Sequence, residues 1–240
     1  MAVQSYDIRS MDKGEVLRYM GYRGQDFDPA LDERIEEGMA RALRVAAPRG
    51  VVRIFDVAGE GADAQGRFEV RLRDTALTLS GESMRRHLHG ARAVGVLAVT
   101  LGMADERELR RLALTDDLGH VIFDAASTTL VERAADAAEA EVVRQAQERG
   151  LFTNFRFSPG YGDLSMQTQP VLLASLDAQR RLGITLSKTL LMTPTKSVTA
   201  IVGLFQERQS STHGSCKGCP CMDFCFLRRT GRTCFDKRKD

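Results

Sequence analysis

Tryptophan is absent from this chain of 240 residues, and aromatic residues of all kinds make up only 6% of it. Cysteine is absent from the first 215 residues and then occurs five times in the last 25. A secreted domain held by disulfides spreads its cysteines along the chain, where they close loops. The distribution therefore predicts a reducing, cytoplasmic location.

An excess of one charge and a long hydrophobic run are also missing. Thirty-four basic residues face 32 acidic ones, so no strong field favours nucleic acid or anionic lipid. The most apolar run, 93–101, is about half of the roughly 20 residues that span a bilayer, and it is typical of a buried strand. The first 20 residues have no apolar core of the signal-peptide kind. We expect no membrane partner, no nucleic acid partner and no export.

Charge and cysteine together divide the chain. Residues 207–240 carry eight basic and four acidic side chains, whereas the preceding part is mildly acidic. The polar stretch at 206–215 is typical of a linker. We therefore expect one domain over 1–206, which has enough hydrophobic residues for a core, followed by a basic, cysteine-rich tail over 207–240.

Hydrophobic spacing predicts mixed helices and strands. Asp12 is placed to cap a helix, with Glu15 three residues on. Neighbouring strands without helices between them favour antiparallel pairing, so the expected class is α+β: a mostly antiparallel twisted sheet with flanking helices, one of them long. Helices are predicted over 29–47, 80–90, 105–114, 117–149 and 170–182, and strands over 51–57, 67–74, 76–80, 93–101, 185–192 and 197–205.

Three local patterns suggest common nucleotide sites and are rejected. Residues 59–64 fit G-x-G-x-x-A, but the chain continues into another alternating strand, which favours a hairpin loop. Residues 195–197 resemble the end of a P-loop without its upstream glycine. Glu139, Glu141 and Glu148 lie on the long predicted helix and are interpreted as a solvated face.

The segment 156–163, R-F-S-P-G-Y-G-D, follows the long helix and is the strongest candidate site. Pro159 and Gly160 predict a tight turn whose amides can approach a ligand closely. Arg156 can hold a carboxylate with two parallel bonds, and the Tyr161 ring can face an adenine or a sulfonium cation. An ordinary loop with a surface arginine and a packed tyrosine is the competing interpretation.

Two motifs in this region resemble the S-adenosylmethionine-binding activation domain of cobalamin-dependent methionine synthase. In that family an Arg-x-x-Pro-Gly-Tyr loop precedes a helix and a hydrophobic-x-Pro-x-x-Ser-Val-[Ser/Thr]-Gly strand. Arg156, Pro159, Gly160 and Tyr161 match the first motif. Met192, Pro194, Ser197, Val198 and Thr199 match the second, in which Ala200 replaces the usual glycine. The segment EVLRYMGYRG and the cysteine-rich tail resemble a free-standing version of the domain.

The resemblance implies a reactivation role. Such a domain presents the sulfonium methyl of S-adenosylmethionine to cob(II)alamin while a reductant, such as flavodoxin or ferredoxin, supplies an electron. It implies that Arg156 binds the methionine carboxylate, that Ser158, Pro159, Gly160 and Tyr161 bind the adenosyl part, and that Glu132 binds the ligand amine or organises the site. A helix-surface salt bridge is the alternative for Glu132. The sequence has no corrinoid motif D-x-H-x-x-G, so cobalamin is expected on a partner, a methionine synthase or related corrinoid protein.

The five tail cysteines have the spacing C-x2-C-x-C-x3-C-x8-C. The close spacing predicts a metal site, and zinc and an iron-sulfur cluster both fit thiolate ligands. The predicted ligands are Cys216, Cys219, Cys221 and Cys225, with Cys234 as a spare or alternative.

Two functions of other classes remain open. One is a methyltransferase that uses S-adenosylmethionine with a different acceptor, which would transfer methyl without any corrinoid protein. The other is a metal-binding interaction module whose basic tail contacts nucleic acid, although the charge excess is small beside that of established basic domains.

Overall fold

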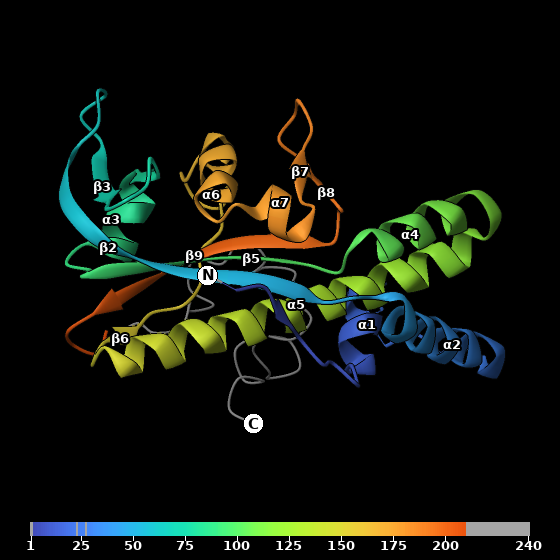
Figure 1. The fold of residues 1–240 in the computed structure, drawn as a ribbon. Coiled ribbons are helices and arrows are strands. Elements are labelled where there is room, and N and C mark those ends of the chain that lie inside the picture. Colours follow the sequence, from blue (N-terminus) through green and yellow to red (C-terminus); the bar gives the residue numbers. More distant parts are fainter. Residues whose placement is uncertain (1, 23, 27, 210–240) are drawn as a thin grey trace.

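A computed structural model describes residues 2–22, 24–26 and 28–209 (Figure 1). Within these ranges the helices flank a curled sheet, as expected for the α+β class. None of the helices in the described ranges is both long and apolar enough to span a bilayer. The elements in chain order are β1 (Gln4–Ser5), α1 (Lys13–Tyr19), α2 (Pro29–Val45), β2 (Arg49–Ala62), β3 (Phe68–Leu72), β4 (Thr78–Ser80), α3 (Glu82–Leu88), β5 (Ala93–Thr100), α4 (Met103–Thr115), α5 (Asp117–Glu148), β6 (Phe152–Thr153), η1 (Met166–Thr168), α6 (Gln169–Ser175), α7 (Ala178–Leu182), β7 (Thr185–Leu186), β8 (Met192–Thr193) and β9 (Ser197–Phe205).

The main sheet has the strand order β4-β3-β2-β5-β9-β6, and β1 pairs with β2. Each of these pairs is antiparallel. The central strand β5 runs in continuous register with β9, from Ala93 opposite Leu204 to Thr100 opposite Ser197. β7 and β8 form a separate hairpin. The sheet thus confirms the predicted antiparallel topology.

The sheet separates two hydrophobic cores, and this explains the uniformly apolar sequence of β5. Leu97 and Val99 pack into the core that α1, α2, α4 and α5 cover. Val94 and Val96 point the other way, into the core beneath α3, α6 and α7. A strand buried on both faces needs apolar residues at every position rather than at alternate ones. The prediction of a buried strand here is confirmed.

Helix α5 lies along one face of the sheet, where it packs against β2, β5, β9 and β6 (Figure 1). Its 32 residues span about 48 Å at 1.5 Å per residue, and the Asp116 side chain caps its N-terminus by accepting from the Gly119 amide. Small residues let it lie close to β5: a Cβ on Gly95 would come within 2.5 Å of Val142 Cγ1.

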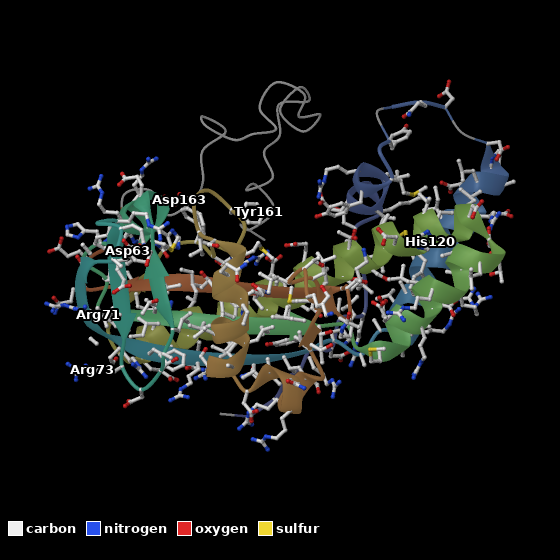
Figure 2. All side chains as sticks on the ribbon, turned by 90° about the horizontal axis from the view of Figure 1, so that it is seen from above. Asp63, Arg71, Arg73, His120, Tyr161 and Asp163 are labelled. Carbon is white, nitrogen blue, oxygen red and sulfur yellow. The ribbon has the colours of Figure 1, made fainter. Side chains whose placement is uncertain are left out.

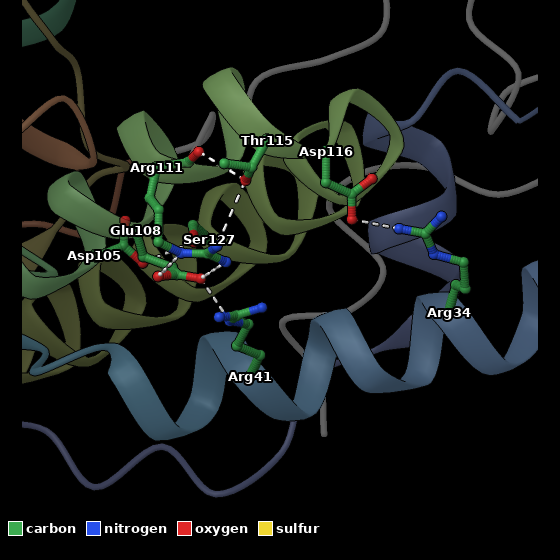
Figure 3. A network of polar contacts seen from close by, with 8 residues as sticks. All are labelled: Arg34, Arg41, Asp105, Glu108, Arg111, Thr115, Asp116 and Ser127. Carbon is green, nitrogen blue, oxygen red and sulfur yellow. Dashed lines mark hydrogen bonds and ion pairs between the residues drawn. The ribbon is translucent and has the colours of Figure 1, made fainter.

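Helix α2 is fixed to the α4–α5 hairpin by ion pairs as well as by its apolar face. Arg34 pairs with Asp116 at 2.5 Å, and Arg41 pairs with Glu108 at 2.5 Å (Figure 3). Asp28 caps α2 by accepting from the Leu31 amide at 2.8 Å. These pairs are partly exposed, so each adds little to stability compared with the apolar contacts beneath them.

Two predicted elements differ from the structure. The helix expected over 170–182 is interrupted at Asp177, whose φ of 53° separates α6 from α7. The strand expected over 185–192 is instead a hairpin of two short strands. Its turn forms because Ser187 Oγ accepts from the amides of Thr189 and Leu191, a local bond that competes with extended structure.

The glycine pattern at 59–64 forms part of the β2–β3 hairpin, as the sequence predicted. Gly59 lies opposite Arg71 in the register, and Cβ atoms placed on Gly59 and Gly61 would meet the Arg71 guanidinium at 3.7 Å. The two glycines thus leave room for an arginine side chain across the ladder, and the pattern needs no nucleotide to explain it.

Candidate functional site

The segment 156–163 leaves the sheet next to its edge strand. Phe157 forms a two-way backbone bridge with Ile201 of β9, with both N–H···O distances at 2.8 Å. Successive side chains of extended backbone point to opposite faces of a sheet, and Phe157 packs into the core beneath α3, α6 and α7. Arg156 therefore turns toward α5, and the following turn projects from the edge of the molecule, where Tyr161 and Asp163 lie (Figure 2).

Arg156 is enclosed by three carboxylates of α5. Its Nη2 donates to Glu132 at 2.8 Å, and its Nη1 lies 2.5 Å from Asp136 and 2.9 Å from Glu139. Its side chain is only 12% exposed, and its backbone amide donates to Glu139 as well. The structure thus brings the predicted residues Glu132 and Arg156 into direct contact across 24 positions of sequence.

The electrostatics of this cluster favour a cation. Burial by itself lowers the pKa of the Arg156 guanidinium, but the carboxylates of Asp136 and Glu139 outweigh it, so the pKa lies above its ordinary value. One guanidinium among three ionised carboxylates leaves a formal excess of two negative charges. Glu132 and Asp136 are 44% and 53% exposed, so this excess faces solvent.

The interpretation of Glu139 as part of a solvated helix face is wrong. Its side chain is 14% exposed, because Arg156 covers it from the sheet side. Glu148 does lie on a solvated face and is 62% exposed. The sequence gives these two residues similar surroundings, and only the path of the chain after β6 distinguishes them.

The turn at Ser158–Tyr161 is tight, as Pro159 and Gly160 predicted. Gly160 has φ of 90°, a conformation that favours glycine, and a Cβ there would also lie 2.8 Å from Met166 Sδ and displace that side chain. The Tyr161 amide donates to Ser158 O and the Gly160 amide to Leu164 O, so both amides are engaged inside the loop. The expectation that amides face a ligand is wrong for these two. The turn instead presents the Tyr161 ring, which is 68% exposed.

The second motif, at β8 and the start of β9, contacts the same helix α5 nearer to the N-terminus of the helix. Lys196 Nζ is 2.7 Å from Thr128 Oγ1 and 2.7 Å from Asp124 Oδ1. Thr128 precedes Glu132 by four positions, and residues with this spacing are neighbours on a helix surface. Arg156 and Lys196, forty positions apart, therefore bring the two motifs together over one row of α5: Asp124, Thr128, Glu132 and Asp136.

Residues near the start of β9 are held by further buried bonds. The Thr195 amide and hydroxyl both donate to Glu106 Oε2, at 2.7 and 2.8 Å. Ser197 Oγ donates to Pro194 O at 2.7 Å and lies 2.9 Å from Thr100 Oγ1. The second motif therefore acts in this fold as an anchor for the strand that carries Ile201.

Comparison with known proteins identifies the family. Residues 84–217 match the family model of the vitamin B12 dependent methionine synthase, activation domain. The chain belongs to this family. No curated protein matches the sequence. A similar solved structure is the crystal structure of the MetH reactivation domain bound to AdoHcy, with 15% sequence identity and a TM-score of 0.52. The match covers 97% of this chain and 87% of the MetH chain. At that identity the likeness concerns the fold alone.

The match to the activation-domain family contains both motif loops and α5 but not α1 or α2. The resemblance stated from Arg156–Tyr161 and Met192–Thr199 is thereby confirmed at the level of the family. The roles of individual residues in ligand binding stay predictions.

Asp136, Asp163 and Lys196 belong to the site's surroundings in this activation-domain fold, and the sequence assigned a role to none of them, although Asp163 and Lys196 lie within the two selected segments. Asp136 carried a usable signal, since it follows Glu132 by four positions on a predicted helix. The partners of Asp163 and Lys196 had no signal in the sequence, because they lie 80 and 68 positions away.

The predicted metal ligands Cys216, Cys219, Cys221 and Cys225 lie outside the described residues, as does Cys234. Within residues 2–22, 24–26 and 28–209, no group of three or more histidine, cysteine, aspartate or glutamate side chains is arranged to hold a metal ion. The metal site of the tail stays a prediction.

Proposed function

We propose that this chain binds S-adenosylmethionine at the Arg156–Tyr161 loop and supports reductive methylation of cob(II)alamin on a cobalamin-dependent methionine synthase or related corrinoid protein. Membership of the activation-domain family supports the cobalamin context. The structural neighbour, which is bound to AdoHcy, supports a ligand of this class. The domain that acts is residues 1–206, in the cytoplasm.

The half-exposed ion pair between Glu132 and Arg156 carries the proposal. The amino-acid end of S-adenosylmethionine is a zwitterion and can insert into this pair. Its carboxylate replaces Glu132 on Nη2 of Arg156, and its ammonium binds the released Glu132 carboxylate. Asp136 and Glu139 stay on Nη1 and keep the guanidinium in place. The ligand carries a net charge of +1, which partly neutralises the acidic cluster.

The rest of the ligand extends along the turn. One wall of the adenosyl site consists of Ser158, Pro159 and Gly160. The exposed Tyr161 ring offers a face to the adenine or the sulfonium. The protein's contribution is positioning, because the methyl group must face the cobalt of the partner. In the reaction the sulfonium carbon–sulfur bond breaks, a cobalt–carbon bond forms, and a reductant of the flavodoxin or ferredoxin kind supplies one electron.

The direct test is calorimetric titration of S-adenosylmethionine into Glu132→Gln. We expect affinity to fall at least about tenfold, because the neutral amide lacks the negative charge that pairs with the ligand ammonium. Glu148→Gln on the same helix is the matched control and should bind like the parent protein. Equal affinities in the two variants would exclude the assignment.

Activity is tested by mixing the protein with S-adenosylmethionine, a reductant and a cob(II)alamin-loaded methionine synthase. The methylcobalamin spectrum should appear only when all components are present. Methyl transfer to another acceptor without a corrinoid protein would instead favour the methyltransferase alternative.

A further inference from the structure

Asp163, at the end of the Arg156–Tyr161 loop, caps a helix that lies far away in the sequence. Its two carboxylate oxygens accept from the amides of Glu82 and Ser83, at 2.6 and 2.9 Å. In return, the Asp163 amide donates to Ser83 Oγ at 3.3 Å. This reciprocal arrangement resembles a capping box, but its two halves come from segments 80 positions apart.

Helix α3 has no N-terminal cap of its own, since Gly81 stands at the capping position without a side chain. A Cβ on Gly81 would lie 2.8 Å from the Asp163 carboxylate, and one on Gly162 would lie 2.3 Å from Ser83 Oγ. Both glycines also have positive φ, of 122° and 54°. The two glycines therefore leave room for the close contact between the loop and α3.

Helix α3 also holds the beginning of the same segment. The His87 ring packs against the rings of Phe155 and Phe157, at centroid distances of 4.9 and 5.1 Å. Asn154 Nδ2 donates to His87 O at 2.7 Å, while Asn154 Oδ1 accepts from the Gly203 amide at 2.7 Å. The residues on either side of the turn at 158–161 are thus both fixed to one helix.

We propose that Asp163 is a positioning residue, which sets the place of the Ser158–Tyr161 turn relative to Arg156 by clamping the loop to the N-terminus of α3. The inference rests on the proposed function for its consequence in ligand binding, but the clamp itself does not depend on it. A carboxylate at a helix N-terminus is favoured by the unpaired amides and by the helix dipole. Burial alone raises the pKa of Asp163, but the bonds from Ser83 and Glu82 outweigh it, so the pKa is lowered and the clamp is charged at neutral pH.

The first measurement does not need a ligand. Because the chain has no tryptophan, Tyr161→Trp provides a single emission reporter on the turn. In this background Asp163→Ala should lower the fluorescence anisotropy and increase quenching by acrylamide, whereas Asp163→Asn, which keeps an acceptor oxygen, should restore most of both signals. Unchanged anisotropy and quenching in Asp163→Ala would overturn the proposal.

The second measurement is binding of S-adenosylmethionine by calorimetry, in the chain with its native Tyr161. Asp28→Ala is the matched control, since it removes the same kind of cap from α2, away from the loop. Both alanine variants should lose similar thermal stability, but only Asp163→Ala should weaken binding, by about tenfold or more. If the affinity for S-adenosylmethionine fell equally in both variants, Asp163 would act only as a helix cap, and the positioning role would be overturned.

The two measurements separate the two proposals. If the parent protein does not bind S-adenosylmethionine but the reporter responds to Asp163→Ala and not to Asp28→Ala, the proposed function fails and the clamp stands. If the parent binds and Asp163→Ala changes neither anisotropy nor affinity, the clamp fails and the proposed function stands.

Discussion

Arg156 is bonded twice to Glu139: its backbone amide donates to Oε1 at 3.2 Å, and its Nη1 donates to Oε2 at 2.9 Å. The loop is therefore joined to α5 through main chain as well as side chain before any ligand binds. Because of this double contact, the carboxylates around Arg156 differ in how firmly they are bound to it. Glu139 is mostly buried and holds the arginine, whereas Glu132 is half exposed, and we expect it to be the partner that a ligand replaces.

Glu139→Ala should lower the free energy of unfolding by about 2 kcal/mol, because it removes a buried partner from a charged group and leaves the Arg156 amide unpaired. Urea denaturation measures the change. Glu148→Ala, which removes an exposed partner of Arg144 on the same helix, should cost less than about 0.5 kcal/mol. Similar losses in both variants would contradict the special place of Glu139.

Arg156→Ala should also cost stability, by about 3 kcal/mol or more, because three carboxylates are left facing one another. We expect this variant to lose S-adenosylmethionine binding together with part of its stability. Thermal melting must therefore show that the variant is folded at the temperature of the titration. Arg156→Lys keeps the charge but not the fork of donors and should recover stability better than affinity. Full recovery of both would mean that the planar fork has no role in the site.

Asp105 predicts an unusual pH dependence of stability. Its side chain is fully buried on α4; one carboxylate oxygen accepts from Ser127 Oγ at 2.7 Å, and the other has no partner among the described residues. Burial is the main cause that raises its pKa from 3.8 to about 6. The folded state therefore favours the protonated acid, and this stabilisation is present below pH 3.8 and is lost as the pH rises through about 6.

Asp105→Asn should remove that loss, because the amide stays neutral and its oxygen can still accept from Ser127. At pH 8 the variant should be more stable than the parent by up to about 3 kcal/mol, and near pH 4 the two should be similar. Urea denaturation at the two pH values measures the difference. A variant that is less stable at pH 8 would contradict the raised pKa and show that Lys196 stabilises the charged Asp105 carboxylate in the fold.

Gly95→Ala should destabilise the protein by about 1–3 kcal/mol, because its Cβ would come within 2.5 Å of Val142 and force α5 away from β5. The double variant Gly95→Ala with Val142→Ala should recover part of the loss, since it vacates the same space. Denaturation of the two single variants and the double variant measures this coupling. Purely additive losses would mean that helix and strand do not touch at this point.

The tail cysteines predict a bound metal in the full chain. Protein purified without oxygen should contain zinc or iron by elemental analysis, and an iron-sulfur cluster should add a visible absorption band that dithionite bleaches. Serine in place of Cys216 or Cys219 should abolish the metal, whereas Cys234→Ser should keep it. Metal-free protein with five reactive thiols would exclude the site.

Local sequence was informative wherever one element decides its own structure. The unbroken apolar run gave β5, the Asp12 and Glu15 pair gave the start of α1, and the lack of proline after Asp117 gave α5. The prediction of one helix over 170–182 was wrong, because nothing in the local sequence distinguishes a continuous helix from two short helices that bury leucines in the same core.

The sequence by itself determined the family, through two short motifs, and the residue types that make up the candidate site. Only the tertiary structure decided that Arg156 is shared by three carboxylates and that Asp163 caps α3. The physical reason is that these contacts join segments 17 to 81 positions apart. Such contacts depend on the order of strands in the sheet and on the position of α5 against the sheet. Neither is encoded in the hydrophobic periodicity of any single segment.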